Sequence, residues 1–187
     1  MSASPPIPVD GLIVAESPEL YWLPKAEWQI LGHLTFHEDW VSEKMLLIRW
    51  FRLVYRITKE TGRSQDKVMW FLRRECGKGG GHVHLHFCMG RLGRNADLTR
   101  LSELLHRAWR SRGGGRCQIE PYDQAKRGVY YILKNLDRSP SCFRESTKFV
   151  WGNGQVMTSH SVWAHLLCRF PRDSKTLLRC QEVSAER

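Results

Sequence analysis

The alternating side chains of residues 82–89, HVHLHFCM, constrain the fold more than any other feature of the chain. Successive side chains of a β-strand point to opposite faces of a sheet, so this stretch would have one apolar face and one face of imidazoles. The glycine-rich residues 77–81, GKGGG, come directly before it and indicate a turn. We therefore expect a sheet with one face in a core and histidines on the other. The apolar side chains are Val83, Leu85 and Phe87, and the imidazoles are His82, His84 and His86.

The other segments supply the remaining elements in a regular order. Ser42 and Asp97 are good helix caps, and Gly62 is a typical helix end. The order β-α-β-β-α-β-α predicts an α+β fold of the ferredoxin-like, or RRM-like, type: an antiparallel sheet with helices packed on one face and the other face free. Expected strands are residues 28–36, 67–76, 82–89 and 115–122, and expected helices are residues 42–62, 96–112 and 123–136.

The chain is expected to form one domain. Residues 1–27, rich in proline and small side chains near the start, are predicted to be a flexible arm; residues 28–170 form the domain, and residues 171–187 form a polar tail. Within 147–170 a hairpin at an Asn-Gly pair is expected, followed by a short helix. The helix at 42–62 is expected to bury a broad apolar face, made of Met45, Leu46, Ile48, Phe51, Leu53, Val54 and Ile57.

Charge and composition limit the classes of partner. The formal net charge of +10 over 187 residues favours a polyanion, either nucleic acid or an anionic membrane surface. No apolar run is long enough to span a bilayer, and the N-terminus lacks a basic segment followed by an apolar one, so an intracellular location is expected. The six cysteines are scattered without a C-x-x-C pair, which indicates reduced thiols rather than a zinc ribbon.

The histidine strand is a candidate metal site. Two imidazoles two residues apart can share a divalent ion, which they bind when neutral. Glu75 ends the preceding strand, across the turn, and a carboxylate beside imidazoles suits Mn²⁺ or Mg²⁺. The alternatives are solvated histidines on an open sheet face and a surface ion pair of Glu75 with Arg73 or Arg74. The competing carboxylates are Glu38, Glu120 and Asp137.

A second chemical feature lies in residues 127–137, RGVYYILKNLD. As a helix, this segment would place Tyr130, Tyr131 and Lys134 off the apolar face, with Lys134 one turn from either tyrosine. A neighbouring ammonium group and a metal-polarised phosphate would both assist attack by a phenol. The alternative is an amphipathic helix whose tyrosines only fill space.

Three short motifs, in this order, resemble those of the HUH endonucleases, and within them the rolling-circle replication initiators with a single catalytic tyrosine. LGHLTF, residues 31–36, is similar to the family's first motif, HLHF, residues 84–87, to its His-hydrophobic-His motif, and YILK, residues 131–134, to its tyrosine motif. The resemblance covers residues 28–137 and makes 28–170 an expected HUH endonuclease domain. No phosphate-binding loop of a helicase is present in the sequence.

The resemblance implies an activity and a set of residues. The activity is metal-dependent, site-specific nicking and joining of single-stranded DNA through a 5′-phosphotyrosine, which initiates rolling-circle replication. The nucleophile would be Tyr131, with Tyr130 as the alternative, assisted by Lys134. The metal, Mn²⁺ or Mg²⁺, would be held by His84, His86 and Glu75, with His82 as the alternative ligand. Basic residues expected to contact DNA are Arg73, Arg74, Lys78 and Arg91.

The implied partners are a single-stranded origin or hairpin, a separate helicase and a polymerase, without a membrane. Relaxases and transposases share the same chemistry. A different alternative is a ferredoxin-like RNA-binding or RNA-processing endoribonuclease, in which a histidine acts on the ribose 2′-hydroxyl without metal. A non-catalytic DNA-binding module is a third.

Overall fold

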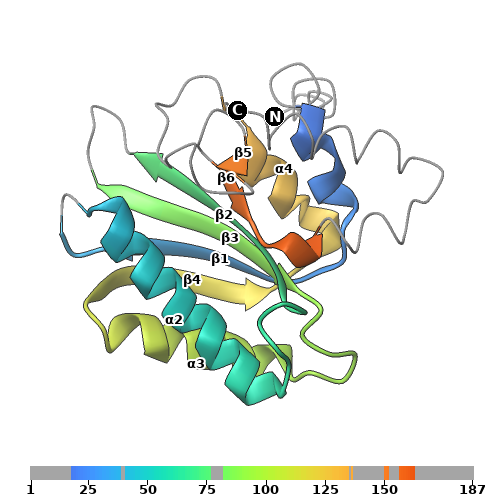
Figure 1. Ribbon diagram of the computed structural model, residues 1–187, viewed down its shortest axis with the longest axis horizontal. Coiled ribbons are helices and arrows are strands. Elements are labelled where there is room, and N and C mark those ends of the chain that lie inside the picture. The colour runs from blue at the N-terminus through green and yellow to red at the C-terminus, as the bar shows by residue number, and fades with distance from the viewer. Residues whose placement is uncertain are drawn as a thin grey trace, which may run out of the picture.

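The structure, a computed structural model, describes residues 18–38, 41–76, 82–134, 136, 150–151 and 156–162. Its centre is a six-stranded antiparallel sheet in the order β4-β1-β3-β2-β6-β5 (Figure 1). The strands are β1 (Trp28–Phe36), β2 (Met69–Cys76), β3 (Val83–Gly90), β4 (Gly114–Pro121), β5 (Val150–Trp151) and β6 (Val156–Thr158). The helices are η1 (Pro18–Lys25), α2 (Glu43–Thr61), α3 (Leu98–Arg110), η3 (Gln124–Lys126) and α4 (Gly128–Leu133).

The predicted α+β fold is confirmed, and its strand order is compatible with a ferredoxin-like arrangement. Strand β1 lies between β3 and β4, and the two long helices each connect strands that are not neighbours in the sheet. The predicted caps also form. The Ser42 hydroxyl accepts a hydrogen bond from the Met45 amide, Asp97 accepts one from the Arg100 amide, and Gly62 ends α2 with a left-handed φ of 64°.

The main core lies between the sheet and helices α2 and α3. Because side chains alternate along a strand, every second residue of β1, β2 and β3 enters this core while its neighbours point to the other face. The strand side chains that enter it include Ile30, Leu34, Trp70, Leu72, Val83, Leu85, Phe87 and Met89, and those of the helices include Leu46, Trp50, Leu101, Leu105 and Trp109.

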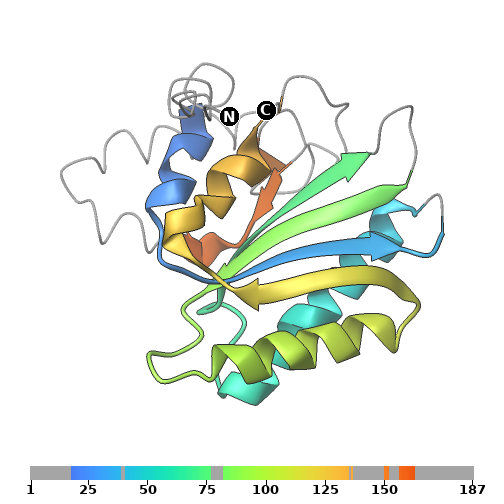
Figure 2. The same ribbon diagram turned by 180° about the vertical axis from the view of Figure 1, so that it is seen from behind.

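The opposite face of the sheet was expected to be free, and the structure corrects this. A second core covers part of that face, where η1 and α4 lie side by side close to β6 (Figure 2). Phe71 and Cys88 of the sheet are fully buried against this layer. Only the remaining part of the face carries the histidines. The second core includes Leu20, Leu23, Met69, Phe71, Cys88, Val129, Ile132, Leu133 and Val156.

Part of the predicted flexible arm is a packed helix. Residues 18–25 form η1, and its side chains Leu20 and Leu23 are fully buried in the second core. The Trp28 indole nitrogen donates a 2.8 Å hydrogen bond to the Leu23 carbonyl oxygen, which fixes η1 against the start of β1. The arm hypothesis for residues 1–17 and the polar tail at 171–187 lie outside the described residues.

The predicted helix at 123–136 is interrupted. It consists of η3 and the short α4, separated by Arg127 at a left-handed φ of 49°. The break lets the start of α4 approach the sheet: a Cβ on Gly128 would lie 3.0 Å from the Leu31 side chain. At the other end, Lys134 is already in an extended conformation. Helix α4 is therefore a short element held close over β1 rather than a long surface helix.

The two strands of the predicted hairpin are also present, since β5 pairs antiparallel with β6 and β6 continues the sheet beside β2, while the Asn-Gly pair itself lies outside the described residues. The predicted buried face of α2 is wrong in part. Leu46, Leu53, Val54 and Ile57 are buried, but Met45, Ile48 and Phe51 are 44%, 36% and 44% exposed. Among the described residues, no helix has both the length and the apolar character needed to cross a membrane.

Candidate metal centre

The strand register brings together three histidines on the uncovered part of the sheet. His33 of β1 lies directly opposite His86 of β3. His84 precedes His86 by two residues on the same strand. The rings of His33 and His86 are stacked, with centroids 4.7 Å apart and an interplanar angle of 15°. His84 packs edge-on against both, at 5.1 Å and 5.2 Å. One ring nitrogen from each histidine lies within 4.8 Å of the other two.

Glu75 completes this cluster from the neighbouring strand. It lies opposite His84 in the register of β2 and β3. Its Oε2 accepts hydrogen bonds from Nε2 of His84 at 3.1 Å and from Nε2 of His86 at 2.9 Å. These hydrogen bonds hold the pKa of the Glu75 carboxyl well below its usual range, despite partial burial, and they raise the pKa of His84. The carboxylate is thus ionised and points between the two imidazoles.

His33 is the member of the cluster that the sequence reasoning missed. Its Nε2 is buried and has no hydrogen-bond partner among the described residues. Burial, with a further contribution from His86 and His84, lowers the pKa of His33 to about 4. The ring is therefore neutral at pH 7, with a lone pair available. The signal was present in WQILGHLTF, where strand alternation places His33 on the face opposite Ile30 and Leu34.

The residues of the cluster fit a divalent cation. An ion with bonds of about 2.1 Å places ligands at right angles about 3 Å apart, which is the spacing of Glu75 Oε2 from the two imidazole nitrogens. The unpartnered Nε2 of His33 is the kind of buried polar atom that a cation would satisfy. A mixed set of imidazoles and one carboxylate suits Mn²⁺ and the later divalent metals better than Mg²⁺.

The other candidate ligands lie elsewhere. His82 precedes β3, is exposed and is not part of the cluster. Glu38 is engaged by Arg49, through hydrogen bonds of 2.7 Å and 3.1 Å. Glu120 lies on β4 at the edge of the pocket that contains the cluster, and Asp137 is outside the described residues.

Tyr131 is on the pocket side of α4. The pocket has a volume of about 420 Å³, and its walls include the three histidines, Glu75 and Tyr131. The Tyr131 ring is 59% exposed and its centroid lies 6.2 Å from that of His86. The Lys134 ammonium lies 3.6 Å from the centre of the same ring. The tyrosine motif and the histidine motif, 45 positions apart at Tyr131 and His86, therefore meet in one pocket.

Tyr130 is placed differently. It is half-buried and packs against the second core, with the Arg127 guanidinium 5.9 Å from its ring centre. Consecutive residues of a helix point about 100° apart, so when Tyr131 faces the pocket Tyr130 faces η1 and the second core. The structure brings Tyr131, and not Tyr130, together with the histidines.

Of the residues predicted to contact DNA, Arg73 needs correction. Arg73 is only 1% exposed, because it faces the second core; it donates hydrogen bonds to the carbonyl oxygens of Ile132 and Lys134 and lies 3.2 Å from Glu75 Oε1. Arg74 points to the other side of the sheet and donates to the Val41 carbonyl oxygen at 3.5 Å. Arg73 therefore positions the site rather than meeting DNA.

Lys78 is outside the described residues. Arg91 is exposed, but it follows the far end of β3, five residues beyond His86 and thus about 17 Å along the strand. Neither residue is placed at the pocket by the structure.

Comparison of the chain with protein-family models, with curated proteins and with solved structures finds no match. The basis for assigning a function is therefore the geometry of this pocket and the motifs that form it.

Proposed function

We propose that this protein is a metal-dependent endonuclease that nicks and joins single-stranded DNA at specific sites through a 5′-phosphotyrosine, as the resemblance to HUH endonucleases implies. One observation carries the proposal: Tyr131, with the Lys134 ammonium over its ring, lies in the same open pocket as His33, His84, His86 and Glu75. A nucleophile, a cation beside it and a set of metal ligands are the parts that phosphoryl transfer to a tyrosine needs.

Each group of residues in the pocket has its own role in the proposed reaction. A divalent ion held by His84, His86 and Glu75, with His33 as an added ligand, would supply charge neutralisation at the scissile phosphate. The Tyr131 phenol would lose its proton to solvent, and its oxygen would bond to phosphorus as the bond from phosphorus to the 3′-oxygen of the upstream strand breaks. That 3′-oxygen would take up a proton and leave as a hydroxyl. A free phenol has a pKa of about 10, so it needs help at neutral pH. The Lys134 ammonium, beside the Tyr131 ring, would assist the attack and hold a phosphate oxygen.

A covalent adduct is the direct test. The protein is mixed with labelled single-stranded DNA and MnCl₂ and resolved on a denaturing gel. Wild-type protein and the Tyr130→Phe variant should form the adduct, whereas Tyr131→Phe should bind DNA without forming it. His84→Ala should lose cleavage together with its metal dependence. An adduct formed by Tyr131→Phe would move the nucleophile to Tyr130.

A parallel cleavage assay with RNA tests the main alternative function. Cleavage of RNA but not of DNA, unaffected by EDTA, would overturn the proposal in favour of an endoribonuclease that uses a histidine on the ribose 2′-hydroxyl. Binding of DNA without nicking under Mn²⁺ or Mg²⁺ would instead indicate a non-catalytic DNA-binding module.

The biological role we propose is initiation of rolling-circle replication at a single-stranded origin or hairpin. Relaxases and transposases would use the same pocket chemistry on other strands. A separate helicase and a polymerase are the partners we propose for opening and copying the replicon. The place of action would be the intracellular compartment in which that replicon is copied.

A further inference from the structure

A second charged cleft lies between α2 and α3, on the face of the sheet opposite the histidines. Its volume is about 420 Å³, and its walls include four arginines. Its floor contains Leu53 and Trp109, which are 3% and 2% exposed. The four arginines are Arg49, Arg52 and Arg56 of α2 and Arg112 directly after α3.

Three of these four guanidinium groups are available for a ligand. Arg49 is neutralised by Glu38. Arg52, Arg56 and Arg112 are exposed and have no acidic partner among the described residues. No acidic side chain from the described part of the chain lines the cleft. Uncompensated arginines that face one hollow form a site for an anion, and arginine in particular suits phosphate.

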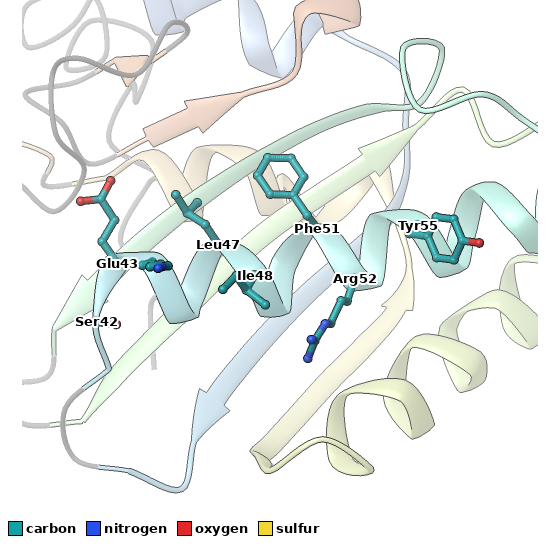
Figure 3. Close-up of a pocket in the computed structure, with 8 residues that line it drawn as sticks. Ser42, Glu43, Leu47, Ile48, Phe51, Arg52 and Tyr55 are labelled. Carbon is teal, nitrogen blue, oxygen red and sulfur yellow. The ribbon is translucent and has the colours of Figure 1, made fainter.

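An exposed aromatic side chain borders the same cleft. Tyr55 is 50% exposed and lies in the wall of the cleft, next to Arg52 and Arg56. It also borders an apolar strip on the outer side of α2, where Figure 3 shows Phe51 and Arg52 leaving the helix on opposite sides. Arg52 and Arg56 are one helical turn apart, about 6 Å. Arginines in a row beside an aromatic ring suit a chain of phosphates that carries bases.

We propose that this cleft binds the phosphate backbone of single-stranded nucleic acid, with Arg52, Arg56 and Arg112 on phosphates and Tyr55 stacked on a base. We favour a single strand over a duplex because the Tyr55 ring beside the arginines can stack only on a base that is not already stacked within a duplex. The site goes beyond the proposed nicking activity and does not depend on it, because the sheet separates the cleft from the histidine pocket. A strand that also enters the pocket would be held at a second point.

Binding without cleavage tests the proposal. Fluorescence anisotropy is measured in EDTA with a labelled oligothymidylate of about 15 nucleotides, a length that covers a typical single-strand site. The double variant Arg52→Glu, Arg56→Glu should bind about tenfold or more weakly than wild type. The matched control is Arg63→Glu, Arg94→Glu, which makes the same change of charge at two exposed arginines outside the cleft. It should stay within about twofold of wild type.

Two further measurements address the mode of binding. Losing two phosphate contacts should reduce the slope of log K against log salt by about 1.4, whereas the control should leave it near the wild-type value. Tyr55→Ala, which keeps all charges, should weaken binding of the oligothymidylate about fivefold through the lost stacking. Thermal melting by circular dichroism confirms that each variant is folded, and Arg52→Gln, Arg56→Gln replaces the glutamate variant if that one melts early.

The proposal would be overturned if the cleft variant and the control lost affinity for the oligothymidylate equally. Tighter binding of a duplex of the same length through the same arginines would also overturn it. So would complete displacement of the oligothymidylate by millimolar inorganic phosphate, which would indicate a simple anion site. The two proposals can fail independently. The anisotropy assay is run without metal and measures binding alone, whereas the adduct assay measures only the covalent bond to Tyr131. A cleft variant that binds weakly but still forms adduct at saturating DNA would support both.

Discussion

The Arg73 guanidinium donates a 2.7 Å hydrogen bond to the carbonyl oxygen of Lys134, and so ties the end of α4 to strand β2. The same group donates to the Ile132 carbonyl oxygen and lies 3.2 Å from Glu75 Oε1. One buried cation therefore joins the helix that carries Tyr131 to the carboxylate beside the histidines. The distance between the tyrosine and the candidate metal ligands depends on this side chain.

Replacing Arg73 should disturb both stability and the pocket. Arg73→Met removes the hydrogen bonds and leaves two backbone carbonyls and a partly buried carboxylate without their donor, so the free energy of unfolding should fall by about 3 kcal/mol. The Arg73→Met variant should also fail to form the adduct under conditions in which it is still folded. Urea denaturation measures the first effect. Arg74→Met is the control, because Arg74 lies on the other face of the sheet, where it donates a long 3.5 Å hydrogen bond to the Val41 carbonyl oxygen. Equal destabilisation by both variants would contradict the role given to Arg73.

His33 should contribute to metal binding although it lies outside the His-hydrophobic-His motif. His33→Ala should weaken Mn²⁺ binding roughly tenfold or more in isothermal titration calorimetry, because one of the converging nitrogens is lost. His82→Ala removes an imidazole of the same strand region that is outside the cluster, and it should leave the affinity unchanged. If the two variants bind Mn²⁺ equally well, the ion does not use His33.

Gly32 should not tolerate a side chain. It lies opposite Phe87 in the register of β1 and β3, and a Cβ at this position would overlap the Phe87 ring. Gly32→Ala should therefore lower the free energy of unfolding by about 1–3 kcal/mol through overpacking. Phe87→Leu shortens the obstructing side chain, so a double-mutant cycle in urea should show that the two changes together cost less than their sum. Strict additivity would mean that the ring is not the obstacle.

The Glu38–Arg49 pair should make a small, pH-dependent contribution to stability. Hydrogen bonds from Arg49 lower the pKa of Glu38 to about 2, below its ordinary value of 4.5. A carboxyl with a depressed pKa in the folded state stabilises the protein above pH 4.5, and this stabilisation is lost as the pH falls through about 2. The Glu38 side chain is 48% exposed, so solvent screening limits the effect.

Glu38→Gln should cost less than about 1 kcal/mol at pH 7 and nothing measurable near pH 2. Denaturant midpoints at a series of pH values check this. Glu103→Gln, which removes an exposed carboxylate of α3, is the control and should show no such difference. A loss for Glu38→Gln that persists unchanged at the lowest pH would show that the carboxylate charge is not what stabilises the loop.

Local physics was enough to predict most elements of the fold. Alternation in residues 28–36 and 82–89 identified two central strands, and Ser42, Gly62 and Asp97 marked helix ends that form as expected. These features depend on neighbours within one turn or one strand, so a single sequence contains them. The order of these elements was also enough to indicate an antiparallel α+β sheet.

What the sequence could not decide were facts that depend on which elements face each other. The register of β1 against β3 puts His33 opposite His86, and the break at Arg127 turns Tyr131 rather than Tyr130 toward them. Arg73 follows the strand alternation of its neighbours, and only the packing of α4 over it makes it a buried clamp rather than a surface charge.

The difference between local features and contacts between elements also explains why the predicted buried face of α2 was wrong in part. Helical periodicity separates an apolar side from a polar side, but it does not say how wide a strip the sheet will cover. The sheet covers Leu46, Leu53 and Ile57, and it leaves Ile48 and Phe51 exposed. The sequence by itself thus determined the strands, the helix ends and the alternate histidines, because these follow from backbone geometry. The tertiary structure alone decided which side chains meet, because contacts between distant residues are set by how the elements pack.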